Sequence, residues 1–543
     1  MRGTPWRLAA ALLVLLAVGC KAEPPAPLRV RPVEALLEGE AWWRDAVFYE
    51  VFVRSYRDTD GDGIGDLRGL IARLDYLNDG DPATTTDLGV TGLWLMPIHP
   101  ATSYHGYDVT DYFDVHPDYG TLDDMRALVE EAHKRGIRVI VDLVLNHTSS
   151  EHPWFRSAVQ GEGQACRDCY LWSATDPGVL GPMGAAWHPS PTGYYYGVFW
   201  SGMPDLNLAN PQIAAQMRLI PRFWLDEIGV DGFRLDAARY LVEQGADLDD
   251  TPATHDWLKG FFAINKGIEP EAYLVGEVTS PLAEIREYGP DELDMAFEFE
   301  TARAIVSAAK TGLAGPVIVA QDMDRTAFPG GRYATFITNH DQNRAMSELG
   351  GDQGRAKVAA SLLLTGPGVP FIYYGEEVGL QGVKPDEDIR LPMPWNAEPG
   401  VGFTSGTPWR APYPDPDGAN VAAQTLADDS LLSHYRRLIA LRNQHAALRT
   451  GEWVRVRSAS QSIHAFLRRT DEETLLVLIN LGAEPVASYG LSLAEGKLPG
   501  RAGVELFSGA TVGMPKAKRD GGFSGYLPLP ELAGYATYII QYR

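Results

Sequence analysis

Short apolar runs alternate with amphipathic stretches between about residue 45 and residue 446. The runs are rich in Val, Ile and aromatic residues, as strands are, whereas apolar residues recur at helical spacing in stretches such as 122–134, 213–227 and 352–364. Eight runs are predicted strands, at 47–53, 90–96, 138–143, 230–236, 273–277, 293–297, 334–338 and 369–374. Because alternating strands and helices indicate parallel pairing, and eight such units favour closure, we predict an α/β fold built on a (β/α)8 TIM barrel.

Two regions depart from this alternation. Between residues 146 and 211 no crossover helix is predicted, and the stretch holds many turn and aromatic residues. A segment of this length inside a compact domain is usually functional, so we expect a small inserted domain after the third strand, on the active-site face. After a last helix at 430–445, short alternating runs separated by Gly and Pro predict a C-terminal antiparallel β-sandwich.

The N-terminus has the features of an export signal. Arg2 and Arg7 precede an apolar run over residues 8–18, which is too short to cross a membrane. The run is followed by Gly19 and Cys20 and resembles a bacterial lipoprotein signal, in which Cys20 becomes the lipidated first residue. We therefore expect an exported protein, lipid-anchored to the cell envelope on its periplasmic or outer face, with plain secretion as the alternative.

These patterns predict a definite domain organisation. The signal peptide takes residues 1–20, a tether 21–42, the barrel 43–145 and 208–446, the inserted domain 146–207, and the sandwich 447–543.

Cysteine is scarce, with 3 residues in the chain. If Cys20 carries lipid, Cys166 and Cys169 remain as a C-x-x-C pair, and in an exported chain the simplest interpretation is a small disulfide loop. A metal site would need further ligands nearby, and a thioredoxin-like redox site would need a different fold around the pair.

The charge balance excludes some partners. The chain of 543 residues carries 47 Lys and Arg against 71 Asp and Glu, a formal net charge of −24. The phosphates of a nucleic acid would be repelled, and a basic lipid-binding surface is not expected. A neutral polysaccharide is compatible with this charge. We expect no nucleic-acid partner, membrane contact only through the lipid anchor, and a monomer.

Three strand-like runs stop at a carboxylate, at Asp236, Glu277 and Asp341. A (β/α)8 barrel gathers the carboxyl ends of its strands at one face, where active sites lie. Converging carboxylates suit cleavage of a glycosidic bond, which requires an acid and a nucleophile or base. Arg234 lies two positions before Asp236, on the same strand face, where its charge would keep Asp236 ionised, whereas the apolar approach to Glu277 would raise its pKa.

A second cluster of oxygen ligands follows the first predicted strand. Between residues 58 and 66, carboxylates recur at alternate positions, with Gly for the sharp turn. This spacing suits Ca²⁺, as in the first part of an EF-hand loop. The predicted ligands are Asp58, Asp60, Asp62, Asp66 and the carbonyl of Ile64.

The motifs in this order resemble those of the α-amylase family of glycoside hydrolases, family thirteen. The matching segments are 142–147 (DLVLNH), 203–207 (MPDLN), 232–236 (GFRLD), 276–278 (GEV), 339–341 (NHD) and 368–375 (GVPFIYYG). The resemblance covers about residues 45 to 543. It also implies a structural calcium at the acidic loop.

The resemblance implies a retaining double displacement. Asp236 would be the nucleophile, Glu277 the general acid and then base, and Asp341 a stabiliser of the transition state. Substrate contacts are implied for His105, Tyr107, His147, Arg234, Arg239 and His340. Arg239 and Tyr240 stand where relatives commonly carry a Lys-His pair on the leaving-group side.

The motif at 203–207 and the short segment before the first strand resemble the group intermediate between oligo-1,6-glucosidases and neopullulanases. Its members act mainly as α-amylases, which implies endo-hydrolysis of α-1,4-glucosidic bonds in starch, glycogen and maltodextrins. The nearest alternative is a maltodextrin glucosidase or transglycosylase on the same scaffold. A non-catalytic starch-binding lipoprotein is a remote alternative, because all three carboxylates are present.

Overall fold

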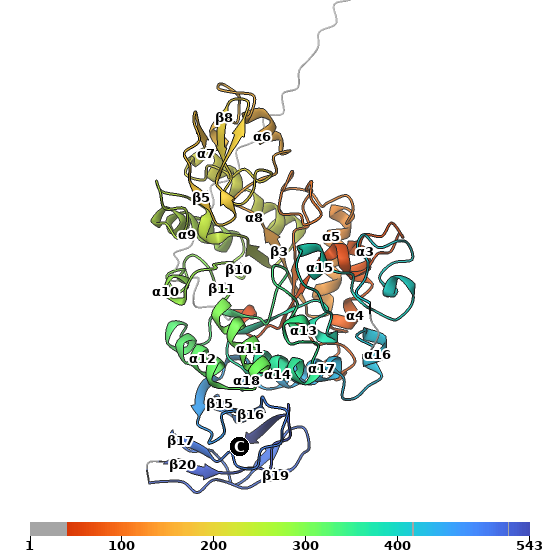
Figure 1. The fold of residues 1–543 in the computed structure, drawn as a ribbon, viewed down its shortest axis with the longest axis vertical. Helices are drawn as coiled ribbons and strands as arrows, with labels where there is room; N and C mark the ends of the chain where they lie inside the picture. The colour runs from red at the N-terminus through yellow and green to blue at the C-terminus, as the bar shows by residue number, and fades with distance from the viewer. Residues whose placement is uncertain (1–40, 415–417, 520) are drawn as a thin grey trace, which may run out of the picture.

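The computed structural model describes residues 41–414, 418–519 and 521–543. The predicted signal peptide, Cys20 and nearly all of the predicted tether lie outside these residues. Figure 1 shows a central barrel with a small sheet-containing region above it and a C-terminal β region below it.

Eight parallel strands form the barrel. They are β1 (Phe48–Val51), β2 (Gly92–Leu95), β3 (Arg138–Leu143), β9 (Gly232–Leu235), β10 (Tyr273–Gly276), β11 (Met295–Ala296), β12 (Ala334–Thr335) and β13 (Val369–Tyr373). Their order is β11-β10-β9-β3-β2-β1-β13-β12, and a parallel bridge between Phe297 and Ala334 joins the two outer strands. The predicted fold class is thereby confirmed.

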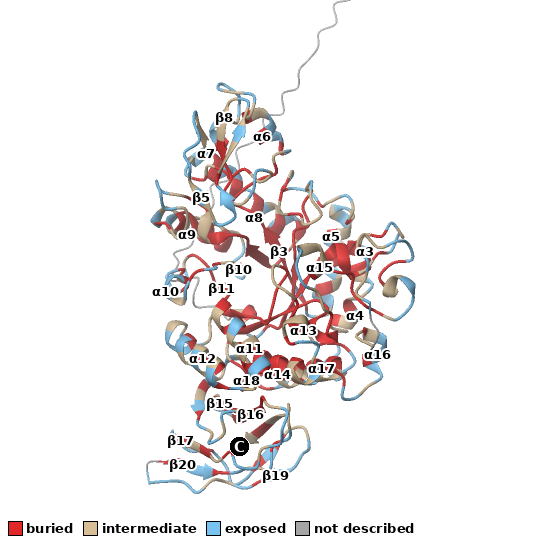
Figure 2. Cartoon of the chain, viewed as in Figure 1, coloured by how far each residue is buried: buried red, intermediate tan, exposed pale blue. Residues whose placement is uncertain are grey.

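Large aromatic side chains fill the inside of the barrel. Phe48 stacks on Phe371 with ring centroids 4.4 Å apart, and Trp94 and Tyr273 are buried with them. The strands are buried along nearly their whole length, as Figure 2 shows at the centre of the molecule. The helices around them include α5 (Leu122–Lys134), α9 (Pro252–Ile268), α11 (Phe299–Thr311), α14 (Gln353–Thr365) and α17 (Leu431–Gln444).

The stretch with helical spacing at 213–227 is helical in the structure but is not one continuous α-helix. The chain instead forms α7 (Pro211–Met217), α8 (Ile220–Arg222) and a π-helical turn, η3 (Phe223–Ile228). Pro221 has no N–H to donate, so the helical hydrogen-bond ladder is interrupted there despite the apolar spacing. Gly229, at φ 87°, then ends the helical segment.

The segment between β3 and α7 forms a small region at the carboxyl end of the barrel. It contains α6 (Pro153–Ala158) and two small antiparallel sheets, of β4 (Trp172–Ser173), β7 (Trp187–Ser190) and β8 (Gly193–Tyr196), and of β5 (Leu180–Gly181) and β6 (Gly184–Ala185). A disulfide joins Cys166 and Cys169. The segment returns to the barrel beside its start, where His147 pairs with Asp205.

The C-terminal region is antiparallel, as predicted. A sheet of order β14-β15-β16-β21-β18-β19 packs against the pair β17 and β20. The bounds are β14 (Glu452–Val456), β15 (Ile463–Arg469), β16 (Thr474–Asn480), β17 (Leu491–Glu495), β18 (Gly503–Glu505), β19 (Thr511–Val512), β20 (Gly521–Tyr526) and β21 (Thr537–Tyr542). None of the helices in the described ranges is both long and apolar enough to cross a membrane.

Candidate active site

The ends of β9 and β10 bring two of the predicted acids together. Asp236 and Glu277 are the residues that follow these strands, and their backbone N–H groups donate to Leu143 (3.2 Å) and Leu235 (2.9 Å). The strands approach closely at Gly232, where a Cβ would lie 2.1 Å from the carbonyl oxygen of Tyr273. Two adjacent strands therefore deliver the carboxylates in register.

Arg234 is the centre of the cluster. Its Nη1 lies 2.8 Å from Asp236 Oδ1 and 2.9 Å from Asp142 Oδ1, and its Nη2 lies 2.6 Å from Glu277 Oε2. The Arg234 side chain is 1% exposed. A buried guanidinium offers a rigid fork of donors, so it fixes the positions of both acids as well as compensating their charge.

In Asp236 and in Glu277, one carboxylate oxygen accepts hydrogen bonds from the protein and the other does not. Arg234 binds Oδ1 of Asp236, while Glu277 Oε2 accepts from Arg234 and from the N–H of Ala237 at 3.2 Å. Within the described ranges, Asp236 Oδ2 and Glu277 Oε1 accept no hydrogen bond from a protein group, and both residues line one cavity. One oxygen of each acid is thus available to a substrate.

Ala237 adopts a backbone conformation that residues other than Gly rarely occupy. Its φ and ψ are 46° and 38°, in the left-handed region. This conformation accompanies the hydrogen bond from the Ala237 N–H to Glu277. Local strain of this kind persists where the surrounding structure enforces it, and it is frequent at active sites.

The third acid, Asp341, is held at both oxygens. Arg390 Nη2 lies 2.9 Å from Oδ1, and His340 Nε2 lies 3.1 Å from Oδ2. His340 Nδ1 in turn contacts Glu50 Oε1 at 2.5 Å, and its Nε2 contacts the Tyr107 hydroxyl at 2.6 Å. Asp341 therefore has two cationic partners of its own, whereas Asp236 and Glu277 share one guanidinium.

Burial and neighbouring charges give the three acids different pKa values. Burial raises the pKa of Asp236 and of Glu277 above their usual values, and the charge of Arg234 opposes this in each case. Burial alone would also raise the pKa of Asp341, but His340 and Arg390 hold it well below its usual range. Carboxyl groups with different environments can take different roles in acid–base chemistry.

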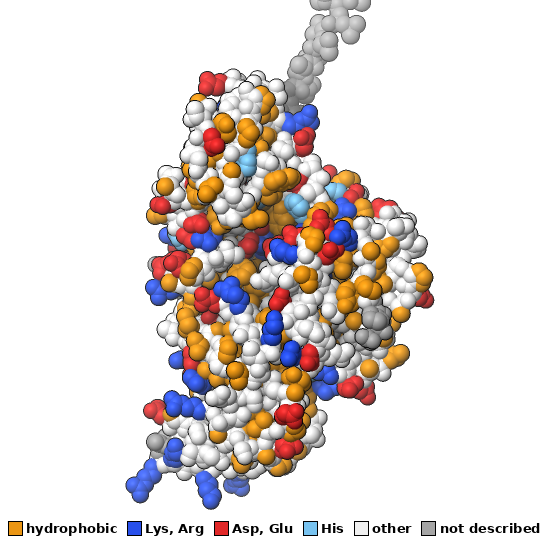
Figure 3. Space-filling model, in the orientation of Figure 1, with side chains coloured by type: hydrophobic (Ala, Val, Ile, Leu, Met, Phe, Trp, Pro, Cys, Tyr) orange, Lys and Arg blue, Asp and Glu red, His pale blue; other side chains and the backbone are white. Residues whose placement is uncertain are grey.

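The three acids line a cavity of about 580 Å³. Figure 3 shows the molecule hollowed between the inserted region and the barrel, with acidic, basic and histidine side chains beside the hollow. The inserted region contributes an apolar wall, in which Trp200 is 51% exposed and Met183 is 76% exposed. Wall residues from this region are Pro182, Met183, Phe199, Trp200 and Met203.

The cavity also brings together the other side chains for which the sequence predicts substrate contact. His105, Tyr107, His147 and Arg239 line it directly, whereas buried Arg234 and His340 do not line it and instead contact acids that do. Burial lowers the pKa of His147 to about 4, and its Nε2 has no hydrogen-bond partner in the structure. Arg239 is held by Asp249 and Asp250 at 3.1 and 2.6 Å.

Sequence analysis did not assign Asp142, Glu50 or Arg390 to the site. Asp142 is fully buried on Arg234, and its Oδ2 accepts from the Tyr107 hydroxyl at 3.1 Å. The position of Asp142 in a matching motif was an available signal. Glu50 lies inside a strand and Arg390 in an irregular segment, so nothing local in the sequence marked them.

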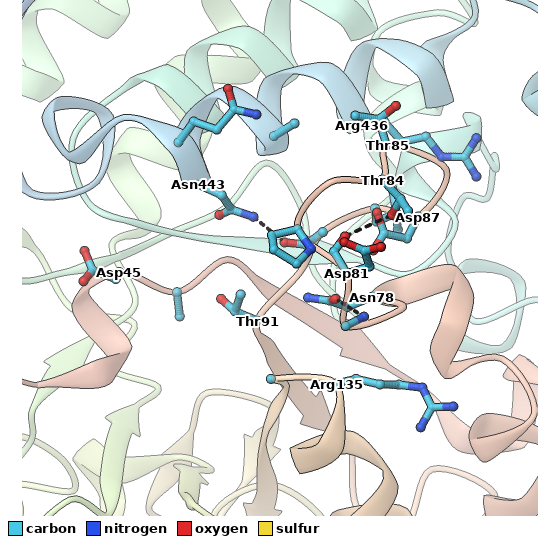
Figure 4. Close-up of a pocket in the computed structure, with 18 of the residues that line it drawn as sticks. Asp45, Asn78, Asp81, Thr84, Thr85, Asp87, Thr91, Arg135, Arg436 and Asn443 are labelled. Atoms are coloured by element: carbon cyan, nitrogen blue, oxygen red, sulfur yellow. Dashed lines mark hydrogen bonds between the residues drawn. The ribbon is translucent and has the colours of Figure 1, made fainter.

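A second cavity lies at the opposite, amino-terminal end of the strands. Its volume is about 560 Å³, and residues before β1 and β2 line it. Figure 4 shows Asp45, Asp81 and Asp87 there among threonine, asparagine and arginine side chains. Active sites of this fold occupy the carboxyl end of the strands, so this cavity is not the catalytic candidate.

The acidic loop after β1 gathers part of its predicted ligand set. Oxygen atoms of Asp58, Asp60 and Asp66 lie within 4.8 Å of one another, and Asp62 is outside this group. Asp58 accepts N–H groups of Asp60 (3.0 Å), Gly61 (2.8 Å) and Gly63 (2.9 Å) as well as the hydroxyl of Thr404. In the described residues these three carboxylates accept hydrogen bonds from backbone N–H groups and threonine hydroxyls, and three converging carboxylates in such surroundings fit a hard divalent cation.

A (β/α)8 barrel with three acids on one cavity at its carboxyl face has the architecture of a glycoside hydrolase. Residues 50–451 match the model of the alpha amylase catalytic domain. The chain therefore belongs to the α-amylase family of glycoside hydrolases, family 13.

Named relatives in this family differ in activity. The chain is 41% identical to "Alpha-amylase 3" of Dictyoglomus thermophilum, over 81% of this chain and 86% of that protein. It is 34% identical to the "Trehalose synthase/amylase TreS" of Mycobacterium tuberculosis, over 83% and 84% of the two chains. Its fold matches the crystal structure of the alpha-amylase from H. orenii with a TM-score of 0.76 and 40% identity, covering 92% of this chain and 99% of that one.

Proposed function

We propose that this glycosidase is an α-amylase that cleaves internal α-1,4-glucosidic bonds with retention of configuration. The observation that supports this most is the sharing of one buried guanidinium by Asp236 and Glu277, each with an oxygen left for substrate. A shared guanidinium keeps the two acids close. Retaining glycosidases hold their two carboxyl groups close together, whereas in inverting enzymes the two groups are farther apart and leave room for a water molecule between the base and the sugar ring.

In the first step the free oxygen of Asp236 attacks the anomeric carbon. Arg234 holds the other oxygen and keeps the carboxylate aligned. Glu277 donates its proton to the departing glycosidic oxygen, and burial, which raises its pKa, favours the protonated form needed for this. The bond from the anomeric carbon to that oxygen breaks as the bond to Asp236 forms.

In the second step Glu277, now ionised, takes a proton from water. The water oxygen attacks the anomeric carbon and releases Asp236 as a carboxylate, so configuration is restored after two displacements. Asp341 remains ionised throughout because His340 and Arg390 stabilise its charge. It is placed to stabilise positive charge that develops on the sugar ring.

A second candidate is a maltodextrin glucosidase or transglycosylase. The identity to a trehalose synthase/amylase and the 32% identity to the oligo-1,6-glucosidase of Parageobacillus thermoglucosidasius favour it. The remote alternative, a starch-binding lipoprotein without activity, is disfavoured by the intact cluster of acids.

We further propose that Asp58, Asp60 and Asp66 hold a structural Ca²⁺, with Asp62 and the Ile64 carbonyl as additional ligands. We also propose that the mature protein is a monomer and that it is anchored through lipid on Cys20.

A product time course on starch, maltotriose, pullulan and a cyclodextrin separates these candidates. Endo attack predicts rapid loss of iodine staining while few small sugars have formed. Early glucose or maltose with persistent iodine staining would favour the glucosidase, and trehalose or longer transfer products would favour the transglycosylase. No reducing sugar from folded protein supplied with calcium would contradict hydrolysis altogether.

A further inference from the structure

The outward face of α12 (Gly315–Ala327) carries a row of apolar side chains. Val319 is 59% exposed and Met323 is 45% exposed, whereas Gln321 and Asp324 lie buried on another side of the helix. Successive residues of a helix are about 100° apart, so the outward apolar residues fall within about 100° of one another. These residues, the α12 stripe, are Pro316, Val319, Ala320, Met323 and Ala327. Figure 3 shows hydrophobic side chains at the surface over this helix.

A helix on the surface of a globular protein usually turns polar residues to solvent. The helix α5 follows this rule, because Glu130 and Lys134 on its outer side are 70% and 55% exposed. In contrast, α12 buries Val317 inward and still exposes apolar residues on its other side. Single exposed apolar residues are common, whereas a continuous row of them marks an interaction surface. The α12 stripe is therefore a surface that another segment or molecule should cover.

The described chain begins beside the carboxyl end of α12. Arg44, in the short helical turn η1 (Trp42–Arg44), donates from Nη2 to the carbonyl of Gly330 at 3.4 Å. Gly330 lies three residues beyond the end of α12. Trp42 fixes the same turn, because its indole N–H donates to the carbonyl of Glu271 at 2.9 Å. The chain before η1 therefore leaves the barrel next to the α12 stripe.

The sequence just before the described residues carries a matching apolar pattern. Val33, Leu36 and Leu37 stand at positions i, i+3 and i+4, which share one face when a segment is helical. Pro32 precedes this run and Gly39 follows it, as at the first position and just past the end of a helix. A helix of this length is not stable alone in water, so the pattern needs an apolar surface against which to pack.

The length of this segment fits the distance. Leu37 lies seven residues and Val33 eleven residues before Arg44, which allows them to reach about 23 Å and 36 Å from it when extended. The α12 stripe is about 17 Å long at the rise of a helix, and its nearer end lies close to Gly330. Residues 33–37 can therefore lie along the stripe without any movement of the described residues.

We propose that residues 33–37 cover the α12 stripe as a short helix whose apolar face packs against Val319 and Met323. Removal of both apolar faces from water is the driving force for this contact. The contact is made within one chain and does not depend on the reaction that the enzyme catalyses.

Docking has a consequence for the lipid anchor proposed at Cys20. It leaves residues 21–32 as the free part of the tether, which spans at most about 40 Å when extended. Arg44 and Gly330 precede β1 and β12, so the docked segment lies at the amino end of the barrel. The membrane would then face the amino end, and the active-site cavity at the carboxyl end would point away from it. This consequence rests on the anchor, whereas the docking does not.

Pairs of cysteines test the contact directly in the full-length protein. Leu36→Cys combined with Met323→Cys should form a disulfide under air oxidation at least about 10-fold faster than Leu36→Cys combined with Leu426→Cys. Leu426 is the matched control, because it is 89% exposed and lies outside the α12 stripe. Peptide mapping identifies the linked residues. Equal rates for the two pairs would overturn the proposal, and so would disulfides that join two chains, which would place a second copy on the stripe.

Cleavage by a glutamate-specific protease gives an independent measurement, because Glu34 and Glu38 lie in or beside the segment. We expect cleavage of the folded protein at these sites to be about 10-fold faster in Met323→Lys than in the wild type, and unchanged in Leu426→Lys. Leu36→Glu alters only the segment, cannot disturb the barrel, and should accelerate cleavage equally. A cooperative thermal melt shows that each variant folds.

Equal cleavage of the wild type, Met323→Lys and Leu36→Glu would contradict docking of the segment. The same assay separates the segment from a lipid surface as the occupant of the stripe. Vesicles of phosphatidylethanolamine and phosphatidylglycerol should leave the cleavage rate of the wild type unchanged. Protection that develops only after vesicles are added would show that lipid covers the stripe in place of the segment, and would overturn the proposal.

Discussion

Two cavities of nearly equal size, about 580 and 560 Å³, lie at opposite ends of one barrel. At the cavity of the carboxyl end, Asp142, Asp236 and Glu277 share the Arg234 guanidinium, which is 1% exposed. In the cavity at the amino end, charged groups form separate pairs near water, such as Arg449 with an Asp45 side chain that is 59% exposed. Volume therefore does not distinguish the two cavities, whereas the burial of converging charges does.

The physical reason is the free energy of desolvation. Bringing several ionisable groups out of water is costly unless their charges and hydrogen bonds are well matched, so sequences rarely assemble such clusters without a use for them. Solvent-exposed ion pairs cost little free energy of desolvation and contribute little to the stability of the fold. The comparison implies that equivalent substitutions at the two ends should have very different consequences.

The largest difference is expected between Asp236→Asn and Asp81→Asn. The first change removes the attacking carboxylate and should lower kcat on starch by about 10⁴-fold or more, with the melting temperature nearly unchanged. Asp81 lines the amino-end cavity, and its replacement should leave kcat within about 2-fold. Reducing-sugar assays and thermal melts measure both. Near-normal turnover by Asp236→Asn would show that another group is the nucleophile.

A second contrast compares Arg234→Lys with Arg449→Lys. A lysine cannot serve Asp142, Asp236 and Glu277 with a planar fork, so we expect kcat to fall by about 10²–10³-fold and the buried acids to be destabilised. Arg449 binds the exposed Asp45 and donates to the carbonyls of Arg442 and Asn443, and its replacement should cost about 1–2 kcal/mol with normal kcat. Comparable losses of activity in the two variants would remove the distinction between the cavities.

Removal of divalent cations should distinguish the acidic loop after β1, at the carboxyl end of the barrel, from the acidic loop with Asp81, at the amino end. The loop with Asp58, Asp60 and Asp66 gathers carboxylates within 4.8 Å, and in the described part of the chain no other group of acids does so. A chelator should lower the melting temperature by about 5–10 °C, and Ca²⁺ should restore it. Asp60→Asn should abolish this response while Asp81→Asn keeps it. A chelator response that survives in Asp60→Asn would place the ion elsewhere.

The smallest expected effect is a pH dependence of stability at the carboxyl end. Asp341 and Glu50 overcome the effect of burial and raise the pKa of His340 to about 10. Because the pKa of His340 is higher in the folded than in the unfolded state, protonated His340 stabilises the fold. This stabilisation is complete when the pH lies below the unfolded-state pKa, near 6.5, and it is lost as the pH rises toward 10. We expect the melting temperature to fall by a few degrees from pH 7 to pH 10, and to fall less in His340→Gln. Parallel decreases in the two proteins would exclude His340 as the source.

The sequence was sufficient for the regular parts of the fold. Alternating apolar runs and helical spacing predicted eight barrel strands, because the pattern follows directly from burial on both faces of a parallel sheet. The apolar spacing of a helix continues through Pro221, whose backbone nitrogen has no hydrogen to donate. The spacing therefore did not predict the interruption of the helix there. The pattern also overestimated the strand at 334–338, of which only Ala334–Thr335 pairs regularly.

The site could be predicted where a residue ends a strand and not where it reaches the site from elsewhere. Asp236 and Glu277 follow their strands directly, so topology places them together. Glu50 contacts His340, and Arg390 contacts Asp341, through tertiary contacts that no local pattern encodes.

The anomeric configuration of the first product tests the central claim most directly. Proton NMR of maltopentaose during the first minutes of hydrolysis distinguishes the α- and β-anomers of the new reducing end before they equilibrate. Attack by Asp236 followed by water activated through Glu277 predicts the α-anomer. Initial release of the β-anomer would mean a single displacement by water and would contradict the roles assigned to both acids.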